Sequence, residues 1–451
     1  MTSPSTSDKV SGRQAVVIGG SMAGLLASRI LSDHFEQVII IERDRFTDNA
    51  EPRKGAPQAR HAHAVLAKAV EIIEDLFPGF FAELEANGST KIDMCNELKF
   101  YHFGKWKKRF AGGIYSYFQN RTFLEWKLRQ WVGKIPNITF MDGTDVMQFT
   151  TDAAKNRVTG VKVRSGDEKA PEDVPADLVV DAGGRGSRTP QWLEALGYPK
   201  VEELVLKVDI AYSTRFFKRT PPDPAPWKSL FIYPKLPDKR LGVILPTEDP
   251  NKWLVTLGGV FGDHPPTDDA GFLDYARSLP VPDLYNVIKD LEPAGPILVY
   301  KMPSNLRHRY ELMARFPDGL VVLGDALCSF NPIYGQGMTT AALDALALDG
   351  CLREQPGGNL TGLSMRFQKK AAAVIANPWL MATAEDMRYD EFPDPISPMI
   401  RFLHWFTGRV HAISDTDELS ALRFTQAMNM LRPPWALFDP RVVWRALTSR
   451  P

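Results

Sequence analysis

The sequence has few cysteines and no sustained hydrophobic run. It contains three cysteines in 451 residues, Cys95, Cys328 and Cys351, and they are far apart. Such a set builds neither a disulfide framework nor a zinc site with closely spaced ligands, which favours a reducing compartment. No stretch approaches the about 18 consecutive apolar residues of a membrane-spanning helix. The Ser-rich leader, Met1 to Gly12, lacks the apolar core of a signal peptide. These absences predict a cytoplasmic protein with at most peripheral membrane contact.

An excess of charge of one sign is also missing. Lys and Arg number 54, and Asp and Glu number 54. Nucleic-acid-binding proteins usually carry a basic domain, so no nucleic-acid partner is expected. Apolar residues make up 44% and charged residues 24%, an ordinary globular composition. Because a chain of 451 residues exceeds the size at which a single hydrophobic core stops growing, two or three cooperating units are expected.

The first part of the chain has the pattern of a β–α–β unit. An apolar run at 15–18 leads through a glycine turn into a helical face, and a second apolar run follows at 38–41. A charged, mostly helical stretch extends to about residue 88. Residues 121–132 have the spacing of a further helix.

The pattern of the sequence changes twice after this region. Residues 208–216 alternate between apolar and polar side chains, and short apolar runs continue to about residue 300, which predicts an antiparallel sheet. A buried-strand run at 319–323 then resembles the apolar runs of the first part of the chain. From residue 360 onward the pattern is helical, with breaks expected at Pro378, Pro393 and Pro433–Pro434.

A glycine-rich turn joins the first apolar run to the first helix. Dinucleotide-binding G-x-G-x-x-G turns need glycine for the tight turn, for the close approach of backbone to pyrophosphate, and for helix–strand contact. Gly19 and Gly24 meet the first and third needs, and Ser21 stands at the position of the middle glycine. The helix N-terminus adds free N–H groups and a positive dipole end. The expected contacts are Gly19, Gly20, Ser21, Met22, Ala23 and Gly24, against the alternative of a plain turn.

Glu42 closes the second apolar run, and Arg43 follows it. A carboxylate at this place can accept hydrogen bonds from the adenosine ribose, and it would repel a 2′-phosphate, which disfavours NADP at this site. Both residues are expected to contact the nucleotide. The fingerprint alone does not distinguish FAD from NAD.

A second glycine loop follows the run at 319–323. It contains Gly324-Asp325 and then, from Asn331, the residues Pro332, Gly335, Gln336, Gly337 and Met338. Reduced flavin carries negative charge near N1, and glycines let backbone N–H groups approach that edge while the helix beginning near Met338 adds its dipole. The alternative is a glycine turn entering a packed helix, with Asp325 as its N-cap.

These residues resemble the GD…P…GxG motif of the FAD-dependent monooxygenase superfamily that includes aromatic hydroxylases and squalene epoxidase. The resemblance implies that Asp325 binds the ribityl chain of FAD and that Pro332, Gly335 and Gly337 lie against the flavin ring. It also implies an α/β fold: a Rossmann-like FAD-binding domain of the aromatic-hydroxylase and glutathione-reductase type, an antiparallel β-sheet substrate domain and a helical C-terminal region. The expected boundaries are 12–90, 120–190 and 301–360 for the first, 91–119 and 191–300 for the second, and 361–451 for the third.

A basic run between residues 53 and 63 is similar to one in bacterial polyketide epoxidases of the lasalocid and monensin type. There the run lies beside the flavin, which implies cofactor contacts for Arg53, Lys54, Arg60 and His61. A solvated surface loop is the alternative. The resemblance extends to Arg121, expected to abut the pyrophosphate, and to the 182–187 turn, where Gly183 would touch FAD and a simple turn is equally compatible. His61 and His63 are too few for a metal site, and no metal is expected.

The resemblance implies a reaction as well as a cofactor. NADPH or NADH, as a transient reductant, would reduce FAD, and a C4a-hydroperoxyflavin would pass one oxygen atom of O2 to a small apolar organic substrate. The substrate would be an alkene or an electron-rich aromatic ring, epoxidised or hydroxylated in secondary metabolism. The cofactor carries this chemistry, so no catalytic triad is needed. The chain would act as a monomer or homodimer. Substrate-lining residues are expected among the aromatic residues of the 200–300 sheet, Tyr212, Phe216, Phe231 and Tyr233.

Three other functions remain as alternatives. The nearest is a FAD-dependent reductase or dehydrogenase of the geranylgeranyl-reductase type. A flavin halogenase is disfavoured because the Trp-x-Trp-x-Ile-Pro motif is missing, and a non-catalytic escort protein of the Rab-inhibitor kind is disfavoured by the intact 325–337 loop. The aromatic cluster Phe402, Trp405 and Phe406 is compatible with a core, a substrate tunnel or membrane contact.

Overall fold

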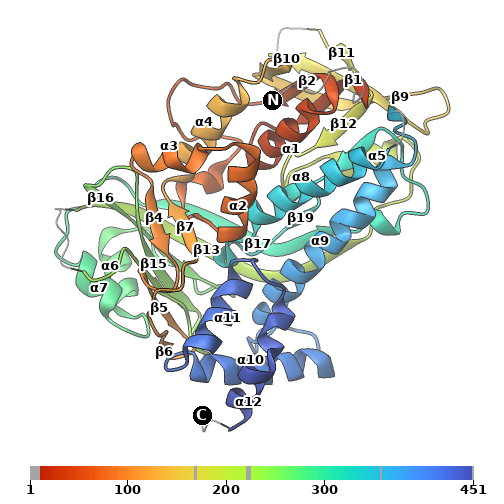
Figure 1. Cartoon of the computed structure of the whole chain (residues 1–451). Helices are drawn as coiled ribbons and strands as arrows, with labels where there is room; N and C mark the ends of the chain where they lie inside the picture. Colours follow the sequence, from red (N-terminus) through yellow and green to blue (C-terminus); the bar gives the residue numbers. More distant parts are fainter. Residues whose placement is uncertain (1–10, 167–169, 220–224, 356–357, 449–451) are drawn as a thin grey trace, which may run out of the picture.

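A five-stranded parallel sheet carries both glycine loops (Figure 1). The computed structural model describes residues 11–166, 170–219, 225–355 and 358–448, so nearly all of the leader at 1–12 lies outside the described residues. Across the sheet, the strands are β18 (Leu320–Val322), β12 (Leu178–Asp181), β1 (Gly12–Ile18), β2 (Phe35–Glu42) and β8 (Ile138–Asp142). All neighbouring pairs are parallel.

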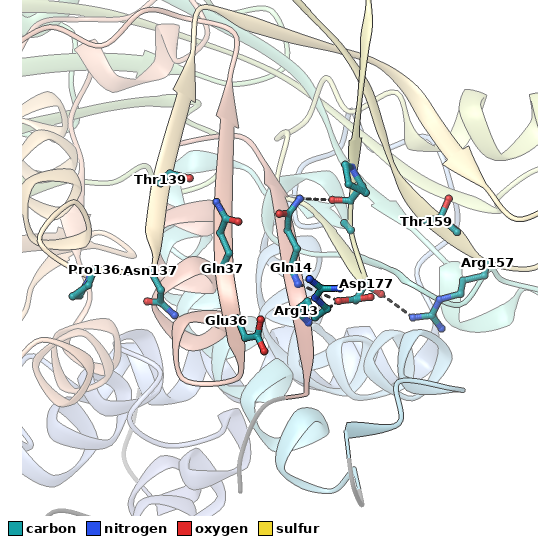
Figure 2. Close-up of a pocket in the computed structure, with 12 residues that line it drawn as sticks. Arg13, Gln14, Glu36, Gln37, Pro136, Asn137, Thr139, Arg157, Thr159 and Asp177 are labelled. Atoms are coloured by element: carbon teal, nitrogen blue, oxygen red, sulfur yellow. Dashed lines mark hydrogen bonds between the residues drawn. The ribbon is translucent and has the colours of Figure 1, made fainter. Parts of the chain in front are cut away.

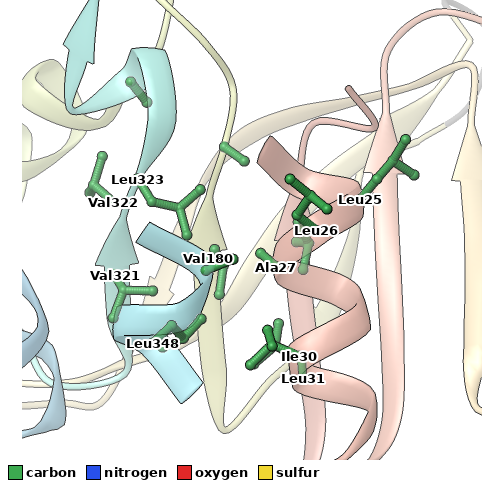
Figure 3. Close-up of a cluster of buried hydrophobic side chains, with 14 of the residues drawn as sticks. Leu25, Leu26, Ala27, Ile30, Leu31, Val180, Val321, Val322, Leu323 and Leu348 are labelled. Atoms are coloured by element: carbon green, nitrogen blue, oxygen red, sulfur yellow. The ribbon is translucent and has the colours of Figure 1, made fainter. Parts of the chain in front are cut away.

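Apolar side chains bury this sheet under helices α1 (Met22–Ser32) and α8 (Gly337–Arg353). The β1 residues Ala15, Val16 and Val17 are fully buried. Figure 3 shows Ala27 and Ile30 of α1 on the side of the helix that faces Val180 and Leu348 of α8. Each such Leu or Ile stabilises the fold by about 1.5–3 kcal/mol. An antiparallel trio, β9 (Thr144–Thr151), β10 (Val158–Ser165) and β11 (Glu172–Pro175), contacts β12.

The predicted antiparallel sheet is present and contains eight strands. Their order is β19 (Cys328–Ser329), β17 (Leu298–His308), β13 (Glu203–Lys218), β16 (Lys252–Gly259), β15 (Arg240–Pro246), β14 (Ser229–Ile232), β5 (Leu98–His102) and β6 (Lys105–Trp106). Every neighbouring pair is antiparallel except β14 and β5. Helices α6 (Asp269–Arg277) and α7 (Asp283–Ile288) pack with one face of this sheet. The expected fold class is therefore confirmed.

A smaller sheet and three helices lie in the segment between β2 and β8. The sheet contains β3 (Ala64–Val65), β7 (Tyr115–Phe118) and β4 (Thr90–Asp93). Helices α2 (Ala67–Leu76) and α3 (Phe80–Ala86) precede β4, and α4 (Arg121–Val132) follows β7 with the bounds predicted from its spacing. The assignment of chain segments to three domains stays a prediction.

The C-terminal part is helical, as expected, but one predicted break is wrong. It contains α9 (Leu363–Asp386), α10 (Pro398–Ile413), α11 (Glu418–Met428), the short η6 (Pro434–Phe438) and α12 (Pro440–Thr448). Pro378 lies inside α9 instead of ending it. Buried side chains on both sides of the proline, among them Ile375 and Ala382, hold the helix against its neighbours, and this packing offsets the lost backbone hydrogen bond. None of the described helices has the length and apolarity needed to cross a bilayer.

Candidate active site

The first glycine turn depends on the absence of side chains. Gly19 has φ +100°, and its N–H donates to the Ile41 carbonyl at 2.8 Å. A Cβ on Gly24 would lie 1.8 Å from the Gly19 carbonyl oxygen. The turn therefore closes tightly between β1 and α1 and leaves the N-terminus of α1, with its unpaired N–H groups and positive dipole end, open toward the carboxyl ends of the strands.

The second glycine loop lies directly against the first helix. Gly324 has φ +61°, and a Cβ on it would lie 2.8 Å from the Cβ of Ala23. The N–H of Gly324 donates to Asp344 of α8 at 3.0 Å. Two loops about 300 residues apart in the sequence thus meet at the N-terminal ends of α1 and α8. This is the arrangement that a single nucleotide bound by both loops requires.

A buried charge network surrounds the N-terminus of α1. Glu125 of α4 accepts hydrogen bonds from the Ser21 hydroxyl, from Arg53, and from Arg121 at 3.3 Å. Arg53 also contacts Glu42 at 3.1 Å, and Glu42 accepts a hydrogen bond from the Gly20 N–H at 2.8 Å. Two predicted residues, Arg53 and Arg121, are thereby brought to the predicted turn.

Glu125 was not predicted from the sequence, although it lies one helical turn after Arg121. Burial acts to raise the pKa of Glu125, but the charges of Arg121 and Arg53 outweigh it and hold the pKa below its usual value. The carboxylate therefore keeps two guanidinium groups in place beside the helix N-terminus. Arg121 keeps a buried Nε with no hydrogen-bond partner among the described residues.

Asp325 follows Gly324 in the second glycine loop. Burial raises the pKa of its carboxyl group, and Arg121 and Arg185 act against that rise. A Cβ on Gly337 would lie 3.6 Å from Asp325 Oδ1, so Gly337 leaves a space beside the carboxylate that a side chain would fill. At the start of α8, Gln336 Oε1 and Thr339 Oγ1 are buried and have no partner among the described residues.

The 182–187 turn adds Arg185 to the site, and the predicted FAD contact of Gly183 stays a prediction. The N–H of Gly183 donates to Asp181 at 2.8 Å, and Asp181 also accepts from Thr189 at 2.6 Å, so these contacts shape the turn itself. Arg185 extends from the turn to the hydroxyl groups of Ser304 at 2.8 Å and Ser329 at 2.9 Å. Its position beside Asp325 was not predicted from the sequence.

The basic run divides into buried and exposed members. Arg53 and His61 are directed inward, whereas Lys54, Arg60 and the preceding Arg43 are exposed. The Nδ1 atom of His61 lies 2.7 Å from the Thr214 hydroxyl, which lies 2.7 Å from the Thr256 hydroxyl. Burial, assisted by the charge of Arg60, lowers the pKa of His61 to about 4. A neutral imidazole therefore joins this loop to the eight-stranded sheet.

The predicted aromatic residues occupy this same side of the eight-stranded sheet. Tyr212, Thr214 and Phe216 follow one another at every second position of β13, so their side chains lie on the same face of the sheet. Because Thr214 contacts His61, this is the face that lies against the 53–63 loop. Tyr233 donates a hydrogen bond to the Ile333 carbonyl in the second glycine loop at 2.5 Å. Phe231 stacks on Tyr233 with ring centroids 6.0 Å apart.

A buried carboxylate fixes the second glycine loop from behind. Asp386, at the end of α9, accepts hydrogen bonds from Asn305 at 2.7 Å, Tyr334 at 2.8 Å and Asn331 at 2.9 Å. Burial raises its pKa to about 7, although the three hydrogen bonds act to lower it. Nothing in the local sequence pattern indicated this contact, because its partners are 52 or more residues away.

A hollow of about 920 Å³ lies elsewhere, at the amino ends of the parallel strands (Figure 2). Gln14, Gln37 and Thr139, from three neighbouring strands, line it together with Arg157 and Asp177. Open parallel sheets bind their ligands beyond the carboxyl ends of the strands. The hollow is therefore separate from the two glycine loops.

Comparisons with known proteins agree with this geometry. A family model described as an FAD binding domain matches residues 13–359. Protein Rv3254 of Mycobacterium tuberculosis is 28% identical over 444 residues, which cover 96% of this chain and 93% of that protein. The match to the family model confirms the predicted FAD cofactor and superfamily, while the closer resemblance to polyketide epoxidases stays a prediction.

Solved structures are similar over most of the chain. The flavin-dependent brominase Bmp2 aligns with a TM-score of 0.64 at 15% identity, covering 97% of this chain and 98% of that one. PqsL, a probable FAD-dependent monooxygenase from Pseudomonas aeruginosa, aligns with a TM-score of 0.58 at 17% identity, covering 84% of this chain and 98% of that one. The 2-methyl-3-hydroxypyridine-5-carboxylic acid oxygenase aligns with a TM-score of 0.60 at 15% identity, covering 93% of this chain and 98% of that one. At these identities the likeness shows a common fold.

Proposed function

Because the chain belongs to the FAD-binding-domain family, we propose that it is an FAD-dependent monooxygenase that inserts one oxygen atom of O2 into an apolar alkene or electron-rich aromatic substrate. One observation carries this proposal. The two glycine loops meet at Ala23 and Gly324, and the aromatic face of β13 and β14 contacts the neighbouring segments through His61 and Tyr233. A nucleotide and an apolar substrate can therefore be held side by side.

The residues at the two loops suit FAD in charge and in space. The N-terminus of α1 offers N–H groups to a diphosphate, and Arg121, whose Nε has no partner among the described residues, lies beside it. Glu42 retains acceptor capacity for a ribose hydroxyl. At the other end, Gly337 leaves room beside Asp325, where a ribityl chain would lie. The unpaired Gln336 Oε1 and Thr339 Oγ1 lie where a polar ring edge could satisfy them.

When bound, FAD would accept electrons from NADH or NADPH and would then activate O2. The chain's own residues orient the reactants and exclude water. Asp386 and Asn331 hold the second glycine loop rigid from behind, and Tyr233 fixes it to the sheet. His61 is neutral at neutral pH, so it holds Thr214 without adding charge to this side of the eight-stranded sheet. Phe216 and Phe231 pack with the apolar cluster on that side of the sheet.

Gly337→Ala tests the proposal with little effect on folding. Gly337 begins α8, and its added Cβ would meet nothing closer than 3.6 Å, so the melting temperature of the FAD-free protein should stay unchanged or rise. The added methyl group would occupy the space beside Asp325, so FAD affinity should fall by about tenfold or more. Gly408→Ala is the matched control, because a Cβ added to Gly408 in α10 would meet no described atom outside that helix within 4 Å.

The reaction type is tested with the parent protein. A monooxygenase consumes O2 and NAD(P)H in proportion to oxygenated product, whereas a reductase of the geranylgeranyl type forms product without O2. A Gly337→Ala variant that retains FAD as tightly as the parent would contradict the flavin site. Product formed at an equal rate under anaerobic conditions would contradict oxygen transfer while leaving that site intact.

A further inference from the structure

Exposed apolar side chains gather on the last helices of the chain. Of 13 large exposed apolar residues in the described chain, seven lie between 399 and 447, so the clustering is not a general property of the surface. Trp405, Trp435 and Trp444 are 49%, 61% and 70% exposed. We call the set the C-terminal aromatic face; its members are Met399, Phe402, Trp405, Trp435, Phe438, Trp444 and Leu447.

The elements that carry these side chains pack against one another. The ring of Phe402 on α10 stacks with that of Phe438 in η6 at 6.2 Å between centroids. Phe438 and Trp435 line the same hollow of about 510 Å³. Arg409 of α10 donates to the Ala446 carbonyl of α12 at 2.7 Å, which ties the two helices together. In Figure 1, α10 and α12 lie at the end of the molecule opposite the parallel sheet.

Arginines border this face, although the whole chain is balanced in charge. Five arginines lie on α10, α12 and the segment before η6: Arg401, Arg409, Arg432, Arg441 and Arg445. The nearby acid Asp439 is already bound by Arg423 at 3.1 Å and Arg441 at 2.9 Å. Asp417 pairs with Arg445. Arg401 and Arg432 are exposed. Exposed tryptophan beside exposed arginine therefore distinguishes this end of the molecule.

We propose that the C-terminal aromatic face docks reversibly on an anionic lipid surface. Tryptophan is suited to the boundary between headgroups and acyl chains, and arginine binds lipid phosphates with several donors. A second copy of the chain fits less well. A symmetric dimer through this face would bring two sets of exposed arginines into one interface, and this repulsion is absent on an anionic membrane. The proposal does not depend on the reaction proposed above.

Vesicle binding tests the proposal on the full-length, FAD-loaded protein. The protein is mixed with vesicles of phosphatidylcholine alone or with phosphatidylglycerol added, and sedimentation and tryptophan fluorescence are measured. We expect binding to the anionic vesicles that weakens as salt is raised, with a blue shift of the emission. Arg401→Glu with Arg432→Glu should lower the affinity by about fivefold or more per residue. Trp405→Ser with Trp444→Ser should reduce the blue shift to what the remaining Trp435 contributes.

Matched variants lie on other surfaces. Arg366→Glu changes an exposed arginine at the start of α9, and Leu312→Ser removes an exposed apolar side chain far from the face in sequence. Both should bind vesicles like the parent. The proposal is overturned if the parent does not bind anionic vesicles at low salt, or if the face variants bind as well as the controls. It is also overturned if light scattering shows a homodimer that the face variants dissociate, since a second copy would then cover the surface.

Discussion

Gly324 contacts Ala23 so closely that no side chain fits between the second glycine loop and the first helix. The two residues are 301 positions apart in the sequence, yet a Cβ on Gly324 would lie 2.8 Å from the Cβ of Ala23. This contact sets the distance between the second glycine loop and the N-terminal end of α1. A nucleotide that spans both loops needs that distance to be fixed before it binds, because ordering the loops during binding would cost affinity.

Gly324→Ala should separate the two loops. The new methyl group meets Ala23, and φ of +61° adds backbone strain, so we expect a loss of about 1–3 kcal/mol in the free energy of unfolding. FAD affinity should fall as well. Denaturant unfolding and flavin titration measure the two effects. Gly337→Ala, in the same loop, is the control that should lower FAD affinity without the loss of stability. Equal stability of both variants would contradict the packing argument.

Glu125→Gln should make the protein more dependent on FAD for stability. The substitution leaves Arg53 and Arg121 buried without their shared counter-charge, which should cost about 3 kcal/mol in the FAD-free protein. The FAD diphosphate would supply negative charge at the same place. The rise in melting temperature on adding FAD should therefore be larger in the variant than in the parent.

A second ion pair of α4 provides the control for Glu125. Glu83 of α3 pairs with Lys127 at 3.1 Å, but its side chain is more exposed, so Glu83→Gln should cost less than about 1 kcal/mol. Its response to FAD should match that of the parent. An equal response to FAD in Glu125→Gln and Glu83→Gln would show that the network around Glu125 is unrelated to the diphosphate.

The local sequence pattern was sufficient to predict helices and strands, but it did not show which residues of different elements contact one another. The helix at 121–132 has the predicted bounds because its apolar spacing, with Leu124 and Leu128 one turn apart, is a local signal. Glu125 shows the limit, since its partners Ser21 and Arg53 come from other elements. Likewise, the exposure of Lys54 and Arg60 depends on which side of the 53–63 loop packs against the sheet. The composition of the loop does not indicate which of its basic residues are buried and which are exposed.

Pro378 illustrates a second limit of local pattern. Proline lowers the intrinsic stability of a helix, which predicts an end at this position. The helix α9 nevertheless continues for eight more residues to Asp386, and this continuation brings Asp386 to Asn331. Tertiary packing thus overrides the propensity at the place where the continued helix supports the second glycine loop.

Asp386→Asn should change the pH dependence of stability. Burial raises the pKa of Asp386 to about 7 in the folded protein, against an ordinary value of 3.8. The folded state therefore holds this proton more strongly than the unfolded state does. The resulting stabilisation is present below about pH 4 and is lost as the pH rises through about 7. Asparagine lacks this titration, so the variant should lose less stability between these pH values.

The free energies of unfolding of Asp386→Asn and of the parent protein should therefore differ most at acid pH. Asparagine cannot accept all three hydrogen bonds from Asn305, Asn331 and Tyr334, which costs about 1–3 kcal/mol. Near pH 8 the parent also carries the cost of a buried charge, so the difference should shrink. Denaturant unfolding across this pH range measures it, with the exposed Asp390→Asn as control. If the difference between Asp386→Asn and the parent grew with pH, the carboxylate would be stabilised in the fold, contrary to its raised pKa.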